Sequence, residues 1–274
     1  MNELSNGDRK IMSDREPLEV VLEFMQHAKQ IISEEMPTGF QTAWKEDNTP
    51  VTQIDKRINA AFITMIADVF PGDVVIGEEE SSEGKPEARK WVIDPIDGTQ
   101  GMLAGLPTYT VCVARLDQDG KPELAVVMNP STDELFIAEE GKPTTLNGEE
   151  IKVSDTDSLK GSLVYMSSRM NDDTASFGTI ADRLLVAGAK PFNVRSVAYG
   201  CLEVARGRFA AAFAGVKTPF EIASVKLIAE NTGATVTDLI GNPIERCDGE
   251  INGFLITNGK VHDEMLELLS KEHN

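Results

Sequence analysis

The sequence contains few cysteines, and this excludes a fold that is stabilised by a framework of disulfide bonds. Among its 274 residues there are only three, Cys112, Cys201 and Cys247. They are odd in number and far apart, which is not the pattern of a disulfide framework, so we expect reduced thiols in the core of an intracellular protein. A chain of about 300 residues buries about 75% of its unfolded surface and needs no disulfides to form a core.

A long hydrophobic run is also missing. No segment approaches the ~20 consecutive apolar residues that span a bilayer. The first residues, MNELSNGDRKIMSDRE, lack the apolar stretch of a secretory signal. We therefore predict a soluble, cytoplasmic protein that does not bind membranes.

Basic residues are in the minority. The chain has 26 Lys and Arg against 45 Asp and Glu, a formal net charge of −19. Nucleic acids and anionic membranes are bound by basic patches, so this charge argues against both as partners. The residues that are abundant, 41% hydrophobic and 26% charged, lie near the averages of globular domains and exclude wholesale disorder.

Hydrophobic periodicity predicts interleaved helices and strands. Helices are expected over 17–33, 54–70, 172–188, 197–206, 219–231 and 261–270, and strands over 74–76, 91–93, 108–116, 123–128, 134–139, 150–153, 191–194, 209–214, 234–239 and 253–257, with a tight turn at Asn147-Gly148. This order lacks strict βαβ regularity and predicts a layered α/β fold with partly antiparallel sheets. No linker or repeat is present, so the halves 1–153 and 154–274 are expected to pack as one catalytic unit.

The segment 91–99, WVIDPIDGT, carries the clearest chemical signal. An apolar strand delivers Asp94 to its carboxyl end, and Asp97 follows after a bend at Pro95, so both carboxylates can converge on one point. A short helix over 99–104 would direct backbone N–H groups to the same point and hold an anion there. Carboxylates beside an anion site require a cation between them, and oxygen ligands favour Mg²⁺. Either Asp alone could equally cap a turn; the combination indicates a metal site.

These residues resemble the W-x-I-D-P-[IL]-D-G-T motif of the inositol monophosphatase family, part of a superfamily of Mg²⁺-dependent, lithium-sensitive phosphatases. Gly77-Glu78-Glu79 is similar to the family's G-E-E, and residues 47–55, DNTPVTQID, to its D-x-[ST]-P-V-T-x-x-D. The likeness continues through 196–208 and 217–241 and covers nearly the whole chain. It implies an αβαβα sandwich, Mg²⁺-dependent hydrolysis of a small phosphomonoester, inhibition by lithium and a homodimer.

The resemblance also assigns roles to single residues. The expected ligands of roughly two or three Mg²⁺ ions are Glu79, Asp94, Asp97 and the carbonyl of Ile96. The neighbouring Glu78 and Glu80 are interpreted as part of a solvated acidic loop.

Further roles concern water and phosphate. Asp55 and the Thr99 hydroxyl are expected to pair and orient the attacking water, which Glu79 also polarises. The backbone N–H groups of Gly98 and Thr99 are expected to bind the phosphate, next to Asp97. Phosphoryl transfer needs this positioning and charge neutralisation more than covalent chemistry.

The second long motif of the family, W-D-x-A-A, is altered to FEIAS at 220–224. Glu221 is expected to replace the Asp as a metal ligand, although its carboxylate must approach from one methylene farther back. The alternative is that Glu221 only complements the dipole of the helix that it opens. A Glu that contacts sugar hydroxyls in enzymes for inositol phosphates is Ala214 here.

The family's G-[ST]-A-A is altered to RSVA at 195–198. Arg195 and Ser196 are expected to contact the substrate, with Arg195 binding a second phosphate or a carboxylate. Arg195 could equally pair with one of the many acidic side chains.

Three alternatives remain beside an inositol phosphatase. A bisphosphate nucleotide or histidinol phosphate fits the N-T-P-V-T string at least as well as inositol phosphate. A catalytically silent protein of the same fold is motivated by Glu221, Ala214 and Arg195. The D-G-T string also ends the D-x-D-G-T motif of haloacid-dehalogenase phosphatases, whose first Asp is a covalent nucleophile, but the spacing here is D-x-x-D-G-T.

Overall fold

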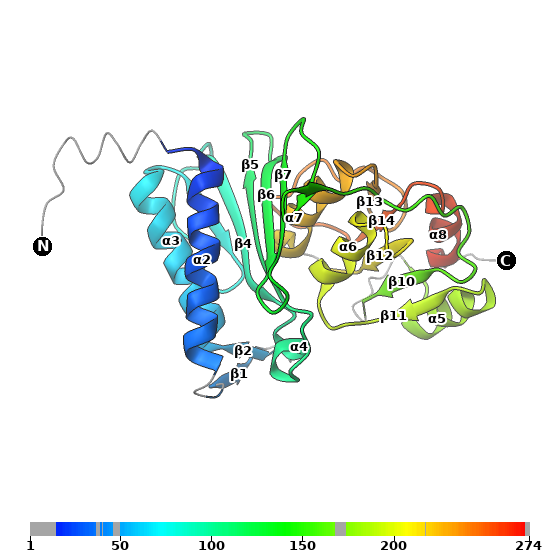
Figure 1. Ribbon diagram of the computed structural model, residues 1–274. Helices are drawn as coiled ribbons and strands as arrows, with labels where there is room; N and C mark the ends of the chain where they lie inside the picture. Colours follow the sequence, from blue (N-terminus) through cyan, green and yellow to red (C-terminus); the bar gives the residue numbers. More distant parts are fainter. Residues whose placement is uncertain are drawn as a thin grey trace, which may run out of the picture.

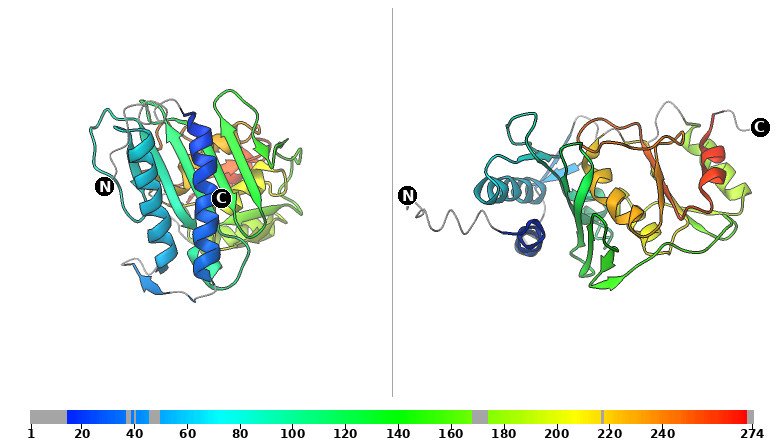
Figure 2. Two further views of the ribbon diagram at one scale, coloured as in Figure 1. Left: turned by 60° about the vertical axis from the view of Figure 1, so that its left-hand side comes forward. Right: turned by 90° about the horizontal axis from the view of Figure 1, so that it is seen from above.

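A computed structural model describes residues 15–36, 39, 41–45, 50–167, 174–216 and 218–271. Its helices and sheets form five layers, which run from one side to the other in Figure 1: a helix pair, a sheet, a second helix pair, a second sheet and a third helix pair. The predicted αβαβα sandwich is confirmed. Figure 2 shows the first helix pair lying against one face of the larger sheet.

The first layer consists of α2 (Pro17–Glu35) and α3 (Gln53–Val69). Their apolar residues recur at helical spacing and pack against the larger sheet. Helix α3 begins with a capping box, in which Thr52 and Asp55 satisfy each other's backbone N–H groups. A hairpin of β1 (Thr42–Trp44) and β2 (Pro50–Thr52) precedes α3, and its strands were not anticipated.

The larger sheet has seven strands. In spatial order they are β3 (Val74–Gly77), β4 (Lys90–Asp97), β5 (Thr110–Leu116), β6 (Pro122–Asn129), β7 (Glu134–Glu139), β8 (Thr145–Leu146) and β9 (Glu149–Glu150). Only β3 and β4 pair in parallel. Alternate residues of β4, β5 and β6 face the first helix pair or the middle helices, so both faces of the sheet are buried.

The middle layer consists of α6 (Val197–Ala205) and α7 (Pro219–Glu230). Most residues of both helices are buried, as expected for helices enclosed between two sheets. The short helix α4 (Thr99–Leu103) follows β4 directly. It lies beside the β1–β2 hairpin at one end of the larger sheet (Figure 1).

The second sheet has five strands, in the order β11 (Lys190–Phe192), β10 (Leu163–Met166), β12 (Ala211–Ala214), β14 (Phe254–Thr257) and β13 (Thr235–Thr237). Parallel and antiparallel pairs are mixed in it, as predicted. Helices α5 (Phe177–Val186) and α8 (His262–Leu269) cover its outer face.

Several element boundaries differ from the expectation. Strand β10 was not predicted, the strand expected over 150–153 is only Glu149–Glu150, and β4 continues beyond Asp94 to Asp97. Helix α5 begins after the Ser176 cap rather than at 172, and residues 172–173 lie outside the described residues, as do residues 47–49 of the N-terminal motif and residues 1–14. Asn147 and Gly148 adopt positive φ between β8 and β9 and so form the expected turn.

The three cysteines are buried and unpaired, as expected. Within the described residues, no helix combines the length and the apolar character needed to cross a membrane.

Candidate active site

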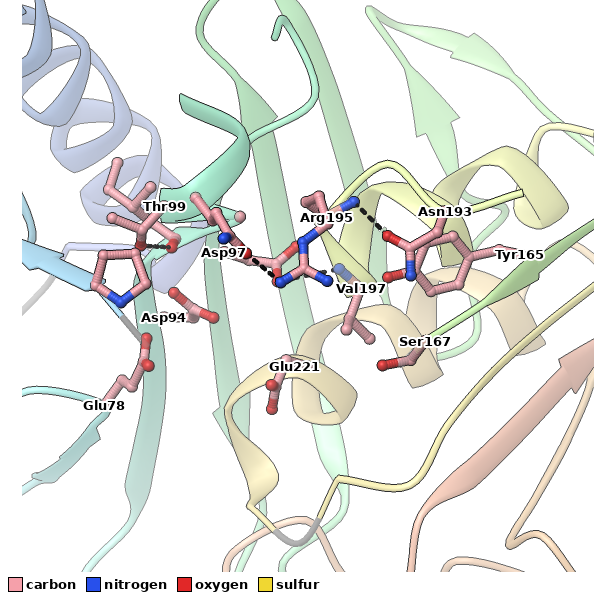
Figure 3. Close-up of a pocket in the computed structure, with 14 residues that line it drawn as sticks. Glu78, Asp94, Asp97, Thr99, Tyr165, Ser167, Asn193, Arg195, Val197 and Glu221 are labelled. Atoms are coloured by element: carbon pink, nitrogen blue, oxygen red, sulfur yellow. Dashed lines mark hydrogen bonds between the residues drawn. The ribbon is translucent and has the colours of Figure 1, made fainter. Parts of the chain in front are cut away.

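A pocket opens where β4 ends, between α4, the start of α6 and the start of α7. Four carboxylates line it, those of Glu78, Asp94, Asp97 and Glu221. Figure 3 shows them on one side of the pocket and a group of neutral polar and basic side chains on the other. Residues of both halves of the chain therefore contribute to a single site.

The two aspartates of β4 reach the pocket because the strand is irregular there. Asp94 is opposite Cys112 and Asp97 is opposite Thr110, and the register with β5 shifts between these two pairs. A bulge of this kind bends a strand and redirects its side chains. The segment with Pro95 therefore brings Asp97 to the same pocket as Asp94, which regular alternation over three residues would not do.

Asp94 is almost completely buried, and its Oδ1 atom has no hydrogen-bond partner. Burial raises the pKa of this carboxyl well above its usual range, and the charges of Glu78, Asp97 and Glu221 raise it further. Glu78 lines the pocket beside Asp94, and the two carboxyls point toward one another (Figure 3). Two carboxyls in contact, one with an unpartnered buried oxygen, fit a bound hard cation.

Asp97 is held by the N-terminus of α6. Its carboxylate accepts hydrogen bonds from the Ser196 hydroxyl, from Val197 N at 3.1 Å and from Ala198 N at 2.8 Å. Burial raises the pKa of Asp97, and these three donors act in the opposite direction. Ser196 was predicted to contact the substrate; its hydroxyl instead binds Asp97, and it does not line the pocket.

Gly98 connects β4 to α4 in a left-handed conformation, with φ of +92°. A Cβ atom at this position would lie 2.7 Å from Cβ of Ser196. Glycine is therefore required both by the backbone conformation and by the close approach of α6. Gly98 and Thr99 line the pocket, and their predicted contacts with phosphate remain predictions.

Asp55 and Thr99 form the predicted pair. Thr99 Oγ1 lies 3.0 Å from Asp55 Oδ1 and 3.0 Å from the carbonyl oxygen of Ile96. The other oxygen of Asp55 accepts bonds from Thr52 N at 2.9 Å and from the Thr52 hydroxyl at 2.6 Å. Burial raises the pKa of Asp55, while the bonds from Thr52 and Thr99 lower it.

The acidic run after β3 differs most from the expectation. Glu78, interpreted above as a solvated residue, lines the pocket, whereas Glu79, the predicted ligand, does not. Glu79 Oε1 lies 2.6 Å from Nζ of Lys45, which is also 2.8 Å from Glu78 Oε1. Both carboxylates thus contact one ammonium group, but only Glu78 also lines the pocket, and the G-E-E motif does not say which of the two does so.

Glu221 reaches the pocket from the first turn of α7, where it is 6% exposed. The Thr218 hydroxyl donates to its Oε2 atom at 3.2 Å. The longer side chain thus brings its carboxylate into the pocket, apart from Glu78 (Figure 3). In the part of the chain that the structure describes, no three acidic, His or Cys side chains already form a metal-ligating group, so the four carboxylates share a pocket without converging on one point.

Arg195 lines the other side of the pocket, as predicted for a substrate contact. It has a positive φ of 63°, its Nη2 atom donates to the side chain of Gln100, and its backbone N donates to Asn193 Oδ1 at 2.9 Å. Tyr165 and Ser167 lie on the same side (Figure 3). These neighbours come from the unanticipated strand β10 and from distant loops, so no local pattern could have indicated them.

Comparison with known proteins agrees with this geometry. A model of the inositol monophosphatase family matches residues 14–274. A protein of Vibrio cholerae named Nus factor SuhB is 33% identical over 204 residues, which are 73% of this chain and 76% of the relative. The histidinol-phosphatase of Chlorobaculum parvum is 32% identical over 206 residues, 74% of this chain and 78% of the relative.

A fructose-1,6-bisphosphatase/inositol-1-monophosphatase of Thermotoga maritima is 29% identical over 247 residues, 90% of each chain. Among solved structures, a Thermotoga maritima IMPase superimposes with a TM-score of 0.81 and 26% identity, covering 92% of this chain and 95% of that one. An IMPase/NADP phosphatase complexed with Mg²⁺ and phosphate gives a TM-score of 0.82 and 25% identity, covering 93% and 95%.

Proposed function

Because the chain belongs to the inositol monophosphatase family, we propose that it is a phosphatase that hydrolyses a small phosphomonoester with the help of divalent cations. The observation that carries this proposal is the pocket in which four carboxylates lie beside the Asp55–Thr99 pair. The relatives named as phosphatases and the similar structure complexed with Mg²⁺ and phosphate support it.

The residues present fit Mg²⁺. All candidate ligands are oxygen atoms, which this ion prefers. We propose that it is held by Glu78, Asp94, Asp97, Glu221 and the carbonyl of Ile96. Glu78 takes the place that the sequence assigned to Glu79, because Glu78 faces Asp94. A bound divalent cation supplies positive charge that stabilises phosphoryl oxygens and makes water more acidic.

Asp55 and Thr99 orient the attacking water in this proposal. The Thr99 hydroxyl carries one proton. When it donates this proton to Asp55 Oδ1, the two lone pairs on Thr99 Oγ1 are left as hydrogen-bond acceptors. The lone pairs of Thr99 Oγ1 can accept a proton from water and so fix its orientation. The carbonyl of Ile96 is then released from Thr99 and can bind a cation. The hydrogen bond from Thr99 to Asp55 thus affects both the orientation of the water and the availability of the Ile96 carbonyl for the cation.

The substrate remains open between inositol, sugar, nucleotide and histidinol phosphates. Arg195, Asn193, Ser167 and Tyr165 line the pocket opposite the carboxylates, which suits a polar or anionic leaving group. The homodimer, lithium inhibition and the cytoplasmic location stay predictions of the family resemblance and of the composition.

The test is phosphate release with and without Mg²⁺ from inositol 1-phosphate, fructose 1,6-bisphosphate, adenosine 3′,5′-bisphosphate and histidinol phosphate. Mg²⁺-dependent turnover of at least one compound is expected. Absence of turnover of all four by a protein that binds Mg²⁺ would favour the catalytically silent alternative.

A further inference from the structure

Lys45 makes two contacts that the phosphatase mechanism does not use. It follows β1, and its Nζ atom lies 2.8 Å from Oε1 of Glu78 and 2.6 Å from Oε1 of Glu79. Its side chain is 27% exposed. The ammonium group therefore lies between a carboxylate that lines the pocket and one that does not.

Glu78 is also in contact with Asp94. The two carboxyls point toward one another in Figure 3, and Oδ1 of Asp94 has no hydrogen-bond partner. A cation that binds Asp94 and Glu78 together must share Glu78 with the ammonium group of Lys45. Two cations on one carboxylate repel each other at short range, and this repulsion is weakly screened in a partly buried site.

We propose that Lys45 competes with the divalent cation for Glu78, and that Glu79 is the anchor that keeps the ammonium group when the cation enters. The inference rests on the proposed function, since it presupposes a cation at Asp94 and Glu78. Lysine suits the role because its charge is compact and its stem is flexible. The side chain can therefore give up Glu78 without leaving Glu79, whose own side chain is only 9% exposed.

Competition and direct ligation make different predictions for the removal of Glu79 once Lys45 is absent. If Glu79 anchors Lys45, its removal leaves the ammonium group on Glu78 alone, and cation binding weakens only while Lys45 is present. If Glu79 is itself a ligand, its removal weakens cation binding whether Lys45 is present or not. The double variant separates the two cases.

The experiment is a titration of the full-length protein with Mn²⁺, in which the electron paramagnetic resonance signal of free Mn²⁺ gives the dissociation constant without any turnover. The variants are Lys45→Met, Glu79→Gln and their combination. Methionine keeps the apolar stem and removes the charge. Lys121→Met is the matched control. Lys121 is exposed, its Nζ atom lies 3.9 Å from Oε2 of Glu245, and neither residue lines the pocket, so this variant removes a lysine charge away from the site.

Lys45→Met is expected to tighten Mn²⁺ binding by about three- to fivefold, as for the loss of one partly exposed ion pair. Lys121→Met should leave the constant unchanged. Glu79→Gln is expected to weaken binding by about two- to threefold in the wild-type background, and by less than that in the Lys45→Met background.

Two results would overturn the inference alone: an unchanged constant in Lys45→Met, or a loss of about tenfold or more for Glu79→Gln in both backgrounds, which marks a residue that holds the metal. Failure of every variant and of the wild type to bind Mn²⁺ would instead contradict the proposed function.

Discussion

Asp94 is the residue on which the candidate site depends most. It is buried, one of its oxygens has no partner, and three other acidic side chains raise its pKa. A protein keeps such an uncompensated group at a cost in stability unless a cation binds there. A substitution of Asp94 should therefore change catalytic activity and the stability of the metal-free protein in different directions.

Asp94→Asn is expected to reduce phosphate release by at least about 100-fold, because a cation ligand is lost. The same substitution should leave the metal-free protein as stable as the wild type or more stable, since it removes a buried charge. Phosphate-release assays and thermal unfolding in EDTA check the two parts. A variant with wild-type turnover would contradict the assignment of Asp94.

The hydroxyl group of Thr99 is the second single group on which the candidate site depends. Thr99→Val removes the hydroxyl that donates to Asp55 and keeps the shape, so turnover is expected to fall by about 100-fold or more. Thr99→Ser keeps the hydroxyl and should lose far less. Similar rates for Val and Ser, measured with saturating Mg²⁺, would show that the hydroxyl does not orient the water.

Helix α6 acts on the site through its first turn. Ser196 is its N-cap and accepts a bond from Tyr199 N at 3.2 Å, and its hydroxyl donates to Asp97. Ser176 caps α5 in the same way, with Thr179 N at 3.2 Å, but has no contact with the pocket. The two caps are therefore a matched pair that separates helix stability from support of Asp97.

Ser196→Ala and Ser176→Ala are each expected to lower the free energy of unfolding by about 1 kcal/mol. Only Ser196→Ala should also weaken Mg²⁺ activation, because Asp97 then loses one of its three donors. Urea unfolding and the Mg²⁺ dependence of phosphate release measure the two effects. Equal activation curves for both variants would mean that Ser196 only caps its helix.

The start of α8 contains a group that should make stability depend on pH. His262 lies between Thr257 Oγ1 at 3.1 Å and Thr237 Oγ1 at 3.2 Å, and burial lowers its pKa from 6.5. The unfolded chain therefore binds a proton at a higher pH than the folded protein does. The free energy of unfolding is expected to fall as the pH decreases below about 6.5.

His262→Gln should remove this component while keeping a polar side chain. Urea unfolding at pH 7.5 and 5.5 is expected to show a smaller loss of stability in the variant than in the wild type. Equal losses would show that His262 does not change its protonation on unfolding in this range.

In the whole molecule, one pocket joins the two halves of the chain. Strand β4 belongs to the first half, and α6 and α7, which provide the donors to Asp97 and the carboxylate of Glu221, belong to the second. A cation bound among these groups would bind only the folded protein and would stabilise all layers together.

Addition of Mg²⁺ at about 100 times its dissociation constant is expected to stabilise the protein by about 2.7 kcal/mol, which raises the unfolding temperature by several degrees. Asp97→Asn should reduce this shift strongly. Differential scanning calorimetry at constant ionic strength, with NaCl as the control salt, checks it. An equal shift with NaCl would indicate general screening of the charge of −19 rather than a site.

Local patterns in the sequence were sufficient for the fold class and for part of the site. The segment 91–99 is contiguous, so it identified the two aspartates, Gly98 and Thr99 without knowledge of distant contacts. Asp55 likewise lies in a contiguous motif, at the capping position of its own helix. Hydrophobic periodicity located most helices and strands near their observed bounds, because burial against a neighbouring layer imposes a period of 3.6 or 2 on each element. The turn at Asn147-Gly148 followed from backbone conformation alone.

The remaining features depend on residues that meet only after the layers pack. Glu78 rather than Glu79 lines the pocket beside Asp94, although Lys45, from the hairpin before α3, contacts both acids. Ser196 turns to Asp97 across 99 positions of sequence. Since the sequence alone records neither the orientation of adjacent side chains at the end of a strand nor contacts between distant segments, these choices belong to the tertiary structure.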